Sequence, residues 1–185
     1  IFPSARKKVT FLYFINPIVF YAIYVHSQLD IIPTALLLYS IHSLTKGRIT
    51  LSSIILGLAL ATKFHVLVVI PLLVMFVIKK YSVKNTLKYA IIPFVVSLLF
   101  DMPFIFSEGF LHMVMYNPKQ SLLLNTYYTV GTLHVLLPIL SIFLIYFHFL
   151  FQRKVNTDLL NFYIASLYIV ILLFIYPEPA WFVWL

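Results

Sequence analysis

The stretch IILGLALATKFHVLVVIPLL, residues 54–73, decides the fold, because one charged residue, Lys63, interrupts a long apolar run. A single helix over 50–78 would place Lys63 near the centre of a membrane, where a charge costs about 2.5–3.5 kcal/mol on insertion scales. Basic clusters lie at both ends of the run, so two crossings are needed to return the chain to the same side. The stretch therefore predicts two short helices that meet near Lys63, with Gly57 allowing close helix approach.

The composition extends this interpretation to the whole chain. Of the 185 residues, 63% are hydrophobic and only five are acidic, and the mean hydropathy is +1.03. A soluble domain of this length cannot bury so much apolar surface, so we expect an all-α polytopic transmembrane bundle that forms a single domain over 1–185. About seven crossings are predicted from the apolar segments 9–27, 31–45, 50–62, 64–78, 88–101, 132–151 and 158–176.

The basic residues predict the orientation of these crossings. Most of them fall in four clusters, at 6–8, 46–48, 79–88 and 153–154. The positive-inside bias places these clusters, and the N-terminal end, on the cytoplasmic side. Because the net charge of +8 is spread over such short loops, it does not indicate a nucleic-acid partner.

Four of the five acids, in contrast, fall on the predicted outer side: Asp30, Asp101, Glu108 and Glu178. Two interpretations remain open for this distribution. The outer face holds an acid-containing site, or its short loops simply carry the solvated residues.

Polar residues gather at the outer end of the first apolar segment. Pro17 removes a backbone donor within that segment, so Asn16 is expected to cap the broken turn. His26, Gln28 and Asp30 follow within five residues, and alternate residues of a loop point the same way. They either converge on a polar ligand or form a solvated turn in which Asp30 caps the next helix.

The remaining candidates also lie on the predicted outer side. Lys63, with His65 two residues later, either extends to the interface or meets a lipid phosphate or a carboxylate. Asp101 ends an apolar helix, where a carboxylate opposes the helix dipole, and pairing with Lys63 would explain its position. Glu108 belongs to the outer, interfacial segment 102–131. Within it, we expect 104–116 either as an interfacial helix or as a loop packed on the bundle.

The chain ends in an aromatic run, Tyr176–Trp184, which is typical of an aromatic belt at a membrane interface. The sequence has no Met at its start and stops inside this run, so we expect it to be part of a longer protein. Phosphate loops, dinucleotide fingerprints and zinc motifs are absent from the sequence, so soluble-enzyme chemistry finds no support.

Three stretches of the sequence resemble the motifs of a known family, and they occur in the same order as those motifs. They are 16–30, with Asn16-Pro17 and Gln28-Leu29-Asp30; 54–71, with Gly57-Leu58-Ala59, Lys63 and Pro71; and 176–184. They resemble the NP…GQxD, GxxLGLAxxxK…P and YPPxWFxWxLP motifs of the C superfamily of polytopic glycosyltransferases. That superfamily includes mannosyltransferases that use polyprenyl-phosphate sugars. One departure is Ser27, which stands where glycine is common before Gln.

The resemblance implies a membrane hexosyltransferase. Such an enzyme moves a mannose-like sugar from a polyprenyl-phosphate donor to a lipid, glycan or protein acceptor at the outer or luminal face. The resemblance also implies that the main catalytic acid lies in an outer loop before Ile1. Asp30 and Asp101 are then expected in supporting catalytic roles or as ligands of a divalent ion, Mg or Mn.

The chemistry of that transfer suggests roles for the other candidates. A departing lipid phosphate needs cationic stabilisation, which Lys63 with His65 is expected to supply. His26, Gln28 and Glu108 are expected to bind the substrate as well, with His26 and Gln28 bonded to sugar hydroxyls.

A non-enzymatic membrane protein is the alternative: a carrier, a flippase or an assembly subunit for lipid-linked glycans. Short, Pro-interrupted helices and a lysine at membrane depth also suit a transport site. The location is either a prokaryotic plasma membrane or the endoplasmic reticulum.

Overall fold

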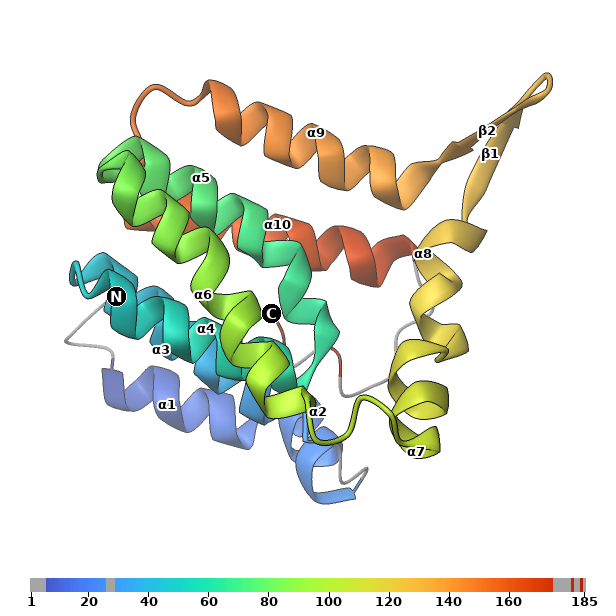
Figure 1. Cartoon of the computed structure of the whole chain (residues 1–185), viewed down its shortest axis with the longest axis horizontal. Coiled ribbons are helices and arrows are strands. Elements are labelled where there is room, and N and C mark those ends of the chain that lie inside the picture. Colours follow the sequence, from blue (N-terminus) through green and yellow to red (C-terminus); the bar gives the residue numbers. More distant parts are fainter. Residues whose placement is uncertain (1–5, 26–28, 175–180, 182–183, 185) are drawn as a thin grey trace.

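The computed structural model describes residues 6–25, 29–174, 181 and 184, and these are mostly helical (Figure 1), as the sequence predicts. The α-helices are α1 (Arg6–Ile15), α2 (Pro17–Phe20), α3 (Ile31–Thr45), α4 (Ile49–Thr62), α5 (Ile70–Lys80), α6 (Val83–Asp101), α7 (Glu108–Phe110), α8 (Leu122–Asn125), α9 (Leu137–Phe151) and α10 (Thr157–Phe174). Short π or 3-10 helices are η2 (Tyr21–Val25), η3 (Phe64–Val69), η4 (Leu111–Met115) and η5 (Pro118–Ser121), and two strands are β1 (Tyr127–Val130) and β2 (Leu133–Leu136).

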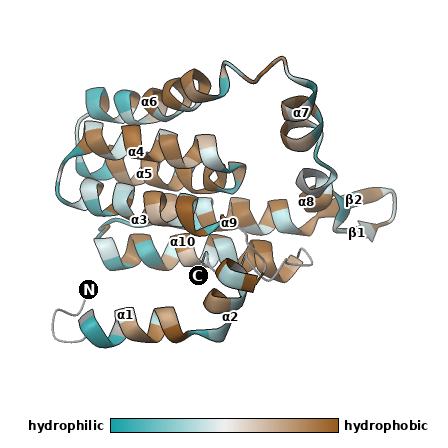
Figure 2. Ribbon diagram, turned by 90° about the horizontal axis from the view of Figure 1, so that it is seen from below, coloured by the Kyte–Doolittle hydropathy of each residue, from teal (hydrophilic) through white to brown (hydrophobic). Residues whose placement is uncertain are grey.

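Six helices form the main bundle. α4 packs between α3 and α6, while α5 packs against α6, α9 and α10. The core is aliphatic and aromatic, with Leu56, Leu72, Phe76 and Leu167 fully buried. α1 lies apart from this bundle and contacts α2 (Figure 2), whose first turn is capped by Asn16 through a 2.9 Å bond from the Ile18 amide to Oδ1. The predicted role of Asn16 is therefore confirmed.

The break predicted at Lys63 is present. α4 ends at Thr62, Lys63 is extended with φ −164° and ψ 132°, and the chain continues as η3 before α5 begins. Pro71 falls in the first turn of α5, where its missing amide hydrogen costs no helical bond. The apolar stretch is thus two helices that meet at the charge, as its flanking basic clusters required.

The predicted count of seven crossings is not supported by the helix lengths. Of the helices among the described residues, two are long and apolar enough to span a membrane: α6 with 19 residues and α10 with 18. The apolar helices α3, α4 and α9 have only 15, 14 and 15 residues, or roughly 21–23 Å at 1.5 Å per residue. The two long helices indicate membrane association, and α6 leaves large apolar side chains such as Leu98 and Phe100 exposed.

The basic clusters gather at one end of the bundle. The start of α1, the α3–α4 turn, the α5–α6 junction and the α9–α10 loop all lie at the left in Figure 1. Figure 2 shows the same end as hydrophilic segments at the starts of α1 and α6. Lys79 also has a structural role there, because its Nζ donates to the carbonyls of Leu150 and Gln152 at 2.7 and 2.8 Å. It thereby caps the end of α9, where a cation complements the helix dipole.

The segment 102–131 extends from the opposite end of the bundle. Within 104–116, α7 and η4 make 108–115 helical, and η5, α8 and the strand β1 follow. β1 pairs antiparallel with β2, a hairpin that the all-α expectation missed. Gly131 turns the chain with φ 62°, a conformation that glycine adopts readily, and most of the hairpin's side chains are exposed.

Small and hydroxylated side chains let α4 approach its neighbours. Ser40 of α3 and Ser52 of α4 exchange hydrogen bonds, and the Tyr89 hydroxyl of α6 lies 3.0 Å from Ser52 Oγ. On the same helix, a Cβ at Gly57 would lie 2.6 Å from Val96 Cβ and 2.7 Å from the Pro93 carbonyl oxygen. Gly57 therefore allows a close helix approach, as the sequence predicts, and the helix that approaches is α6.

We expect Gly57→Ala to lower the thermal unfolding midpoint of the detergent-solubilised chain. The added methyl must displace the backbone of α6, a strain of about 1–3 kcal/mol that exceeds the gain in helix propensity. Gly109→Ala is the control, because a Cβ there meets no atom within 4 Å. Equal midpoints for the two variants would contradict the close α4–α6 contact.

Candidate functional site

The candidate site centres on a part-buried ion pair between Lys63 and Asp30. Asp30 is only 4% exposed, whereas the Lys63 side chain is 35% exposed. Asp30 precedes α3 at the N-cap position, yet its side chain makes no capping bond, and its carbonyl accepts a 2.8 Å bond from the Thr34 hydroxyl. The expectation that Asp30 caps this helix is therefore correct for its position but wrong for its carboxylate, which faces Lys63.

The α3–α4 hairpin brings the two charges together. α3 and α4 differ in length by one residue and pack along each other, joined by a tight turn at Gly47, whose φ is 77°. The residue before α3 and the residue after α4 therefore meet at the same end of the hairpin. Both charges also suit their places, because an anion is favoured at a helix N-terminus and a cation at a helix C-terminus.

A group of aromatic side chains lies beside this ion pair. The indole ring of Trp184 stacks on His65 at 4.2 Å between centroids and on Trp181 at 5.2 Å. Lys63 Nζ lies 5.7 Å from the centroid of Trp184, within the range of a cation–π interaction. Tyr168 of α10 approaches both His65 and Trp184, at 5.9 and 5.7 Å. We call His65, Tyr168, Trp181 and Trp184 the aromatic cluster.

The aromatic cluster corrects the predicted aromatic belt and adds Tyr168 to the candidate site residues. Trp184 is 9% exposed and belongs to the buried core, so it does not face the lipid as part of an aromatic belt. Its indole face lies toward the Lys63 ammonium, which such a face attracts. Tyr168 was missed, although a phenol within the apolar run of α10 is a signal that could have marked it. Residues 176–180, which carry the start of the aromatic motif, lie outside the described part of the chain.

The other predicted site residues are not gathered here. Asp101 accepts a 3.0 Å bond from Ser97 on its own helix α6, so the predicted Asp101–Lys63 pair is wrong: Lys63 pairs with Asp30. Glu108 lies exposed in α7, on the segment that leaves the bundle. His26 and Gln28, predicted to bind substrate, lie outside the described residues.

The described residues by themselves offer no cluster of metal ligands. Among 6–25, 29–174, 181 and 184, no group of three or more His, Asp or Glu side chains could hold a metal ion. The Asp30 carboxylate is paired with Lys63, and Asp101 is bonded to Ser97. The expected divalent ion stays a prediction.

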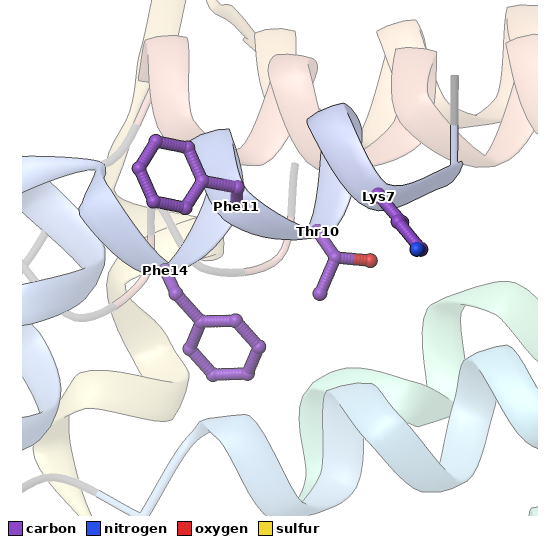
Figure 3. A pocket seen from close by; sticks show the side chains of 4 residues that line it. All are labelled: Lys7, Thr10, Phe11 and Phe14. Atoms are coloured by element: carbon purple, nitrogen blue, oxygen red, sulfur yellow. The ribbon is translucent and has the colours of Figure 1, made fainter. Parts of the chain in front are cut away.

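A pocket on α1 lies apart from these residues. It is lined by Lys7, Thr10, Phe11 and Phe14 (Figure 3). All four belong to α1, and none is a predicted site residue. The ion pair and its aromatic cluster therefore remain the candidate site.

We compared the chain with models of known protein families, with curated proteins and with solved structures, and none of the three comparisons gave a match.

We expect Lys63→Met to destabilise the chain more than Asp30→Asn. Loss of Lys63 leaves a buried carboxylate unpaired, a defect that costs about 3–5 kcal/mol. Loss of the Asp30 charge leaves a lysine that is 35% exposed and reaches water, which costs about 1 kcal/mol. Thermal unfolding of both variants in the same detergent measures the difference. Equal losses would contradict the unequal burial of the two groups.

Proposed function

We propose that the chain belongs to a membrane glycosyltransferase that moves a mannose-like sugar from a polyprenyl-phosphate donor to a lipid, glycan or protein acceptor. One observation carries the proposal: a buried carboxylate, Asp30, is paired with a half-exposed lysine, Lys63, beside the aromatic cluster. Transfer of a sugar from a lipid phosphate requires a carboxylate that takes the hydroxyl proton and a cation that stabilises the leaving phosphate. Here a carboxylate and a cation are in contact.

The reaction assigns a role to each charge. The acceptor hydroxyl oxygen forms a bond to the anomeric carbon, and the bond from that carbon to the phosphate oxygen breaks. The phosphate oxygen keeps the electron pair, and Lys63 stabilises that charge. The hydroxyl proton passes to a carboxylate. Asp30, released from Lys63 by the arriving phosphate, orients the acceptor or the sugar for this step.

The position of the site within the bundle supports this assignment. Asp30 and Lys63 lie at the end of the α3–α4 hairpin, whereas its turn lies among the basic clusters at the other end of the bundle. In our proposal the basic end faces the cytoplasm and the ion pair faces the outside or the lumen. In this proposal α6 and α10 span the full membrane, and the shorter apolar helices cross where the bilayer thins around the bundle. The proposed arrangement therefore still has seven crossings.

A carrier or flippase for lipid-linked glycans is the second candidate. The observation that favours it is the break between α4 and α5 at Lys63, because interrupted helices with a charge at the break are typical of transport sites. Both candidates require a lipid phosphate at Lys63. They differ in whether a glycosidic bond is formed.

The transferase proposal predicts that Lys63→Ala lowers sugar transfer at least tenfold, because the leaving phosphate loses its cation. The measurement is transfer from radiolabelled polyprenyl-phosphate mannose to endogenous acceptors in membranes that contain the protein. Lys84→Ala, a charge removal at the exposed start of α6, is the control and should leave the rate unchanged. Flipping of the labelled lipid without glycoside formation would favour the carrier.

The proposed orientation predicts opposite labelling of two single-cysteine variants. The chain has no cysteine, so Val83→Cys at the basic end and Thr132→Cys in the hairpin turn each create one exposed thiol. An impermeant maleimide added to sealed right-side-out vesicles should label Thr132→Cys, and Val83→Cys only after the membrane is opened. Labelling of both thiols from one side would contradict the proposed orientation.

A further inference from the structure

Buried polar atoms without partners concentrate beside the ion pair. Within the described part of the chain, the buried side-chain nitrogen and oxygen atoms that have no hydrogen-bond partner are Asp30 Oδ2, both ring nitrogens of His65, the Tyr168 hydroxyl and Trp184 Nε1. These residues are linked by the Lys63 contacts and the ring contacts of the aromatic cluster. Each such atom costs about 1–3 kcal/mol when unpaired, so their concentration in one place points to a missing partner.

The chemistry of these atoms restricts that partner. Asp30 Oδ2 only accepts, Trp184 Nε1 only donates, and a Tyr hydroxyl does both. A neutral His65 ring offers one donor and one acceptor. An anion would satisfy the donors alone and a cation the acceptors alone, whereas hydroxyl groups satisfy every member of the set.

We propose that His65, Tyr168, Trp184 and the free oxygen of Asp30 form a subsite for the ring hydroxyls of a sugar. Lys63 sets the orientation of the ligand, because it is more exposed than Asp30 and its Nζ lies 5.7 Å from the Trp184 ring. The phosphate of a sugar phosphate meets Lys63, and the sugar ring points inward to the subsite. This inference rests on the proposed function, since it names the part of the donor that the same site recognises.

Binding of a sugar at this subsite is expected to change the fluorescence emission of tryptophan. The unpartnered atoms are closed to solvent, so side chains of the aromatic cluster must move when the sugar enters. The chain contains two tryptophans, Trp181 and Trp184, and they stack on each other in the aromatic cluster. Tryptophan emission therefore reports directly on the occupied site.

Two buried tyrosines give a matched pair of variants. Tyr168→Phe removes a hydroxyl that has no partner in the free protein, so it should not lower the unfolding midpoint. Tyr89→Phe removes a hydroxyl that is bonded to Ser52, so it should lower the midpoint without touching the subsite. A third variant, His65→Phe, keeps an aromatic ring for the stack on Trp184 and removes both ring nitrogens.

The experiment titrates tryptophan emission with two probes, a short-chain prenyl-phosphate mannose and the same prenyl phosphate without the sugar. We expect Tyr168→Phe and His65→Phe each to weaken binding of the mannose probe about tenfold, the usual effect of losing one ligand hydrogen bond. Binding of the sugarless probe should stay within about twofold, and Tyr89→Phe should bind both probes like the wild type.

The outcomes separate this inference from the proposed function. Equal affinity of Tyr168→Phe and the wild type for the mannose probe means that the unpartnered atoms hold water only, and it overturns the subsite. Failure of the mannose probe to bind overturns it too. A third outcome is that the protein transfers no sugar but binds the mannose probe more tightly than the sugarless probe, and that Tyr168→Phe weakens this binding. That result supports the subsite and contradicts the transferase proposal.

Discussion

The structure depends on how Lys63 is accommodated. An ammonium group in the middle of an apolar run can be stabilised by reaching water, by meeting an anion or by facing an aromatic ring, and this chain uses all three. Lys63 remains 35% exposed, pairs with Asp30 and lies over Trp184. The break between α4 and α5 places the charge at the end of the bundle, where these partners are within reach.

Close packing of α4 makes this arrangement possible. α4 lies between α3 and α6, with Ser52 bonded to Ser40 on one side and to Tyr89 on the other. Gly57 brings the backbone of α6 nearer than any side chain would allow. Since polar and small residues hold apolar helices together where lipid offers no hydrophobic driving force, these contacts fix the α3–α4 hairpin and with it the Asp30–Lys63 pair.

The ion pair and the aromatic cluster form a site that is polar, buried and incompletely bonded. Buried networks of this kind are costly when only partly satisfied, so a protein gains stability when a ligand completes them. The proposed sugar phosphate would do so by bringing hydroxyls to the unpartnered atoms and a phosphate to Lys63. Transferase and carrier share this requirement, and the formation of a glycosidic bond distinguishes them.

The sequence by itself determined the helical character of the chain, the break at Lys63, the cap at Asn16 and the close approach at Gly57, because each follows from local rules of charge, backbone donors and side-chain size. Asp30 and Lys63 are nearly equidistant in sequence from Gly47, so they meet if the chain turns there as a hairpin of two helices of nearly equal length. The sequence suggested Asp101 as the partner of Lys63, and the packing of α3 on α4 placed Asp30 there instead. The burial of Trp184 and Tyr168 against His65 was decided by the tertiary structure alone. In the aromatic cluster, residues far apart in the sequence come into contact. A local sequence pattern cannot predict which distant aromatic ring will pack against a given lysine or histidine.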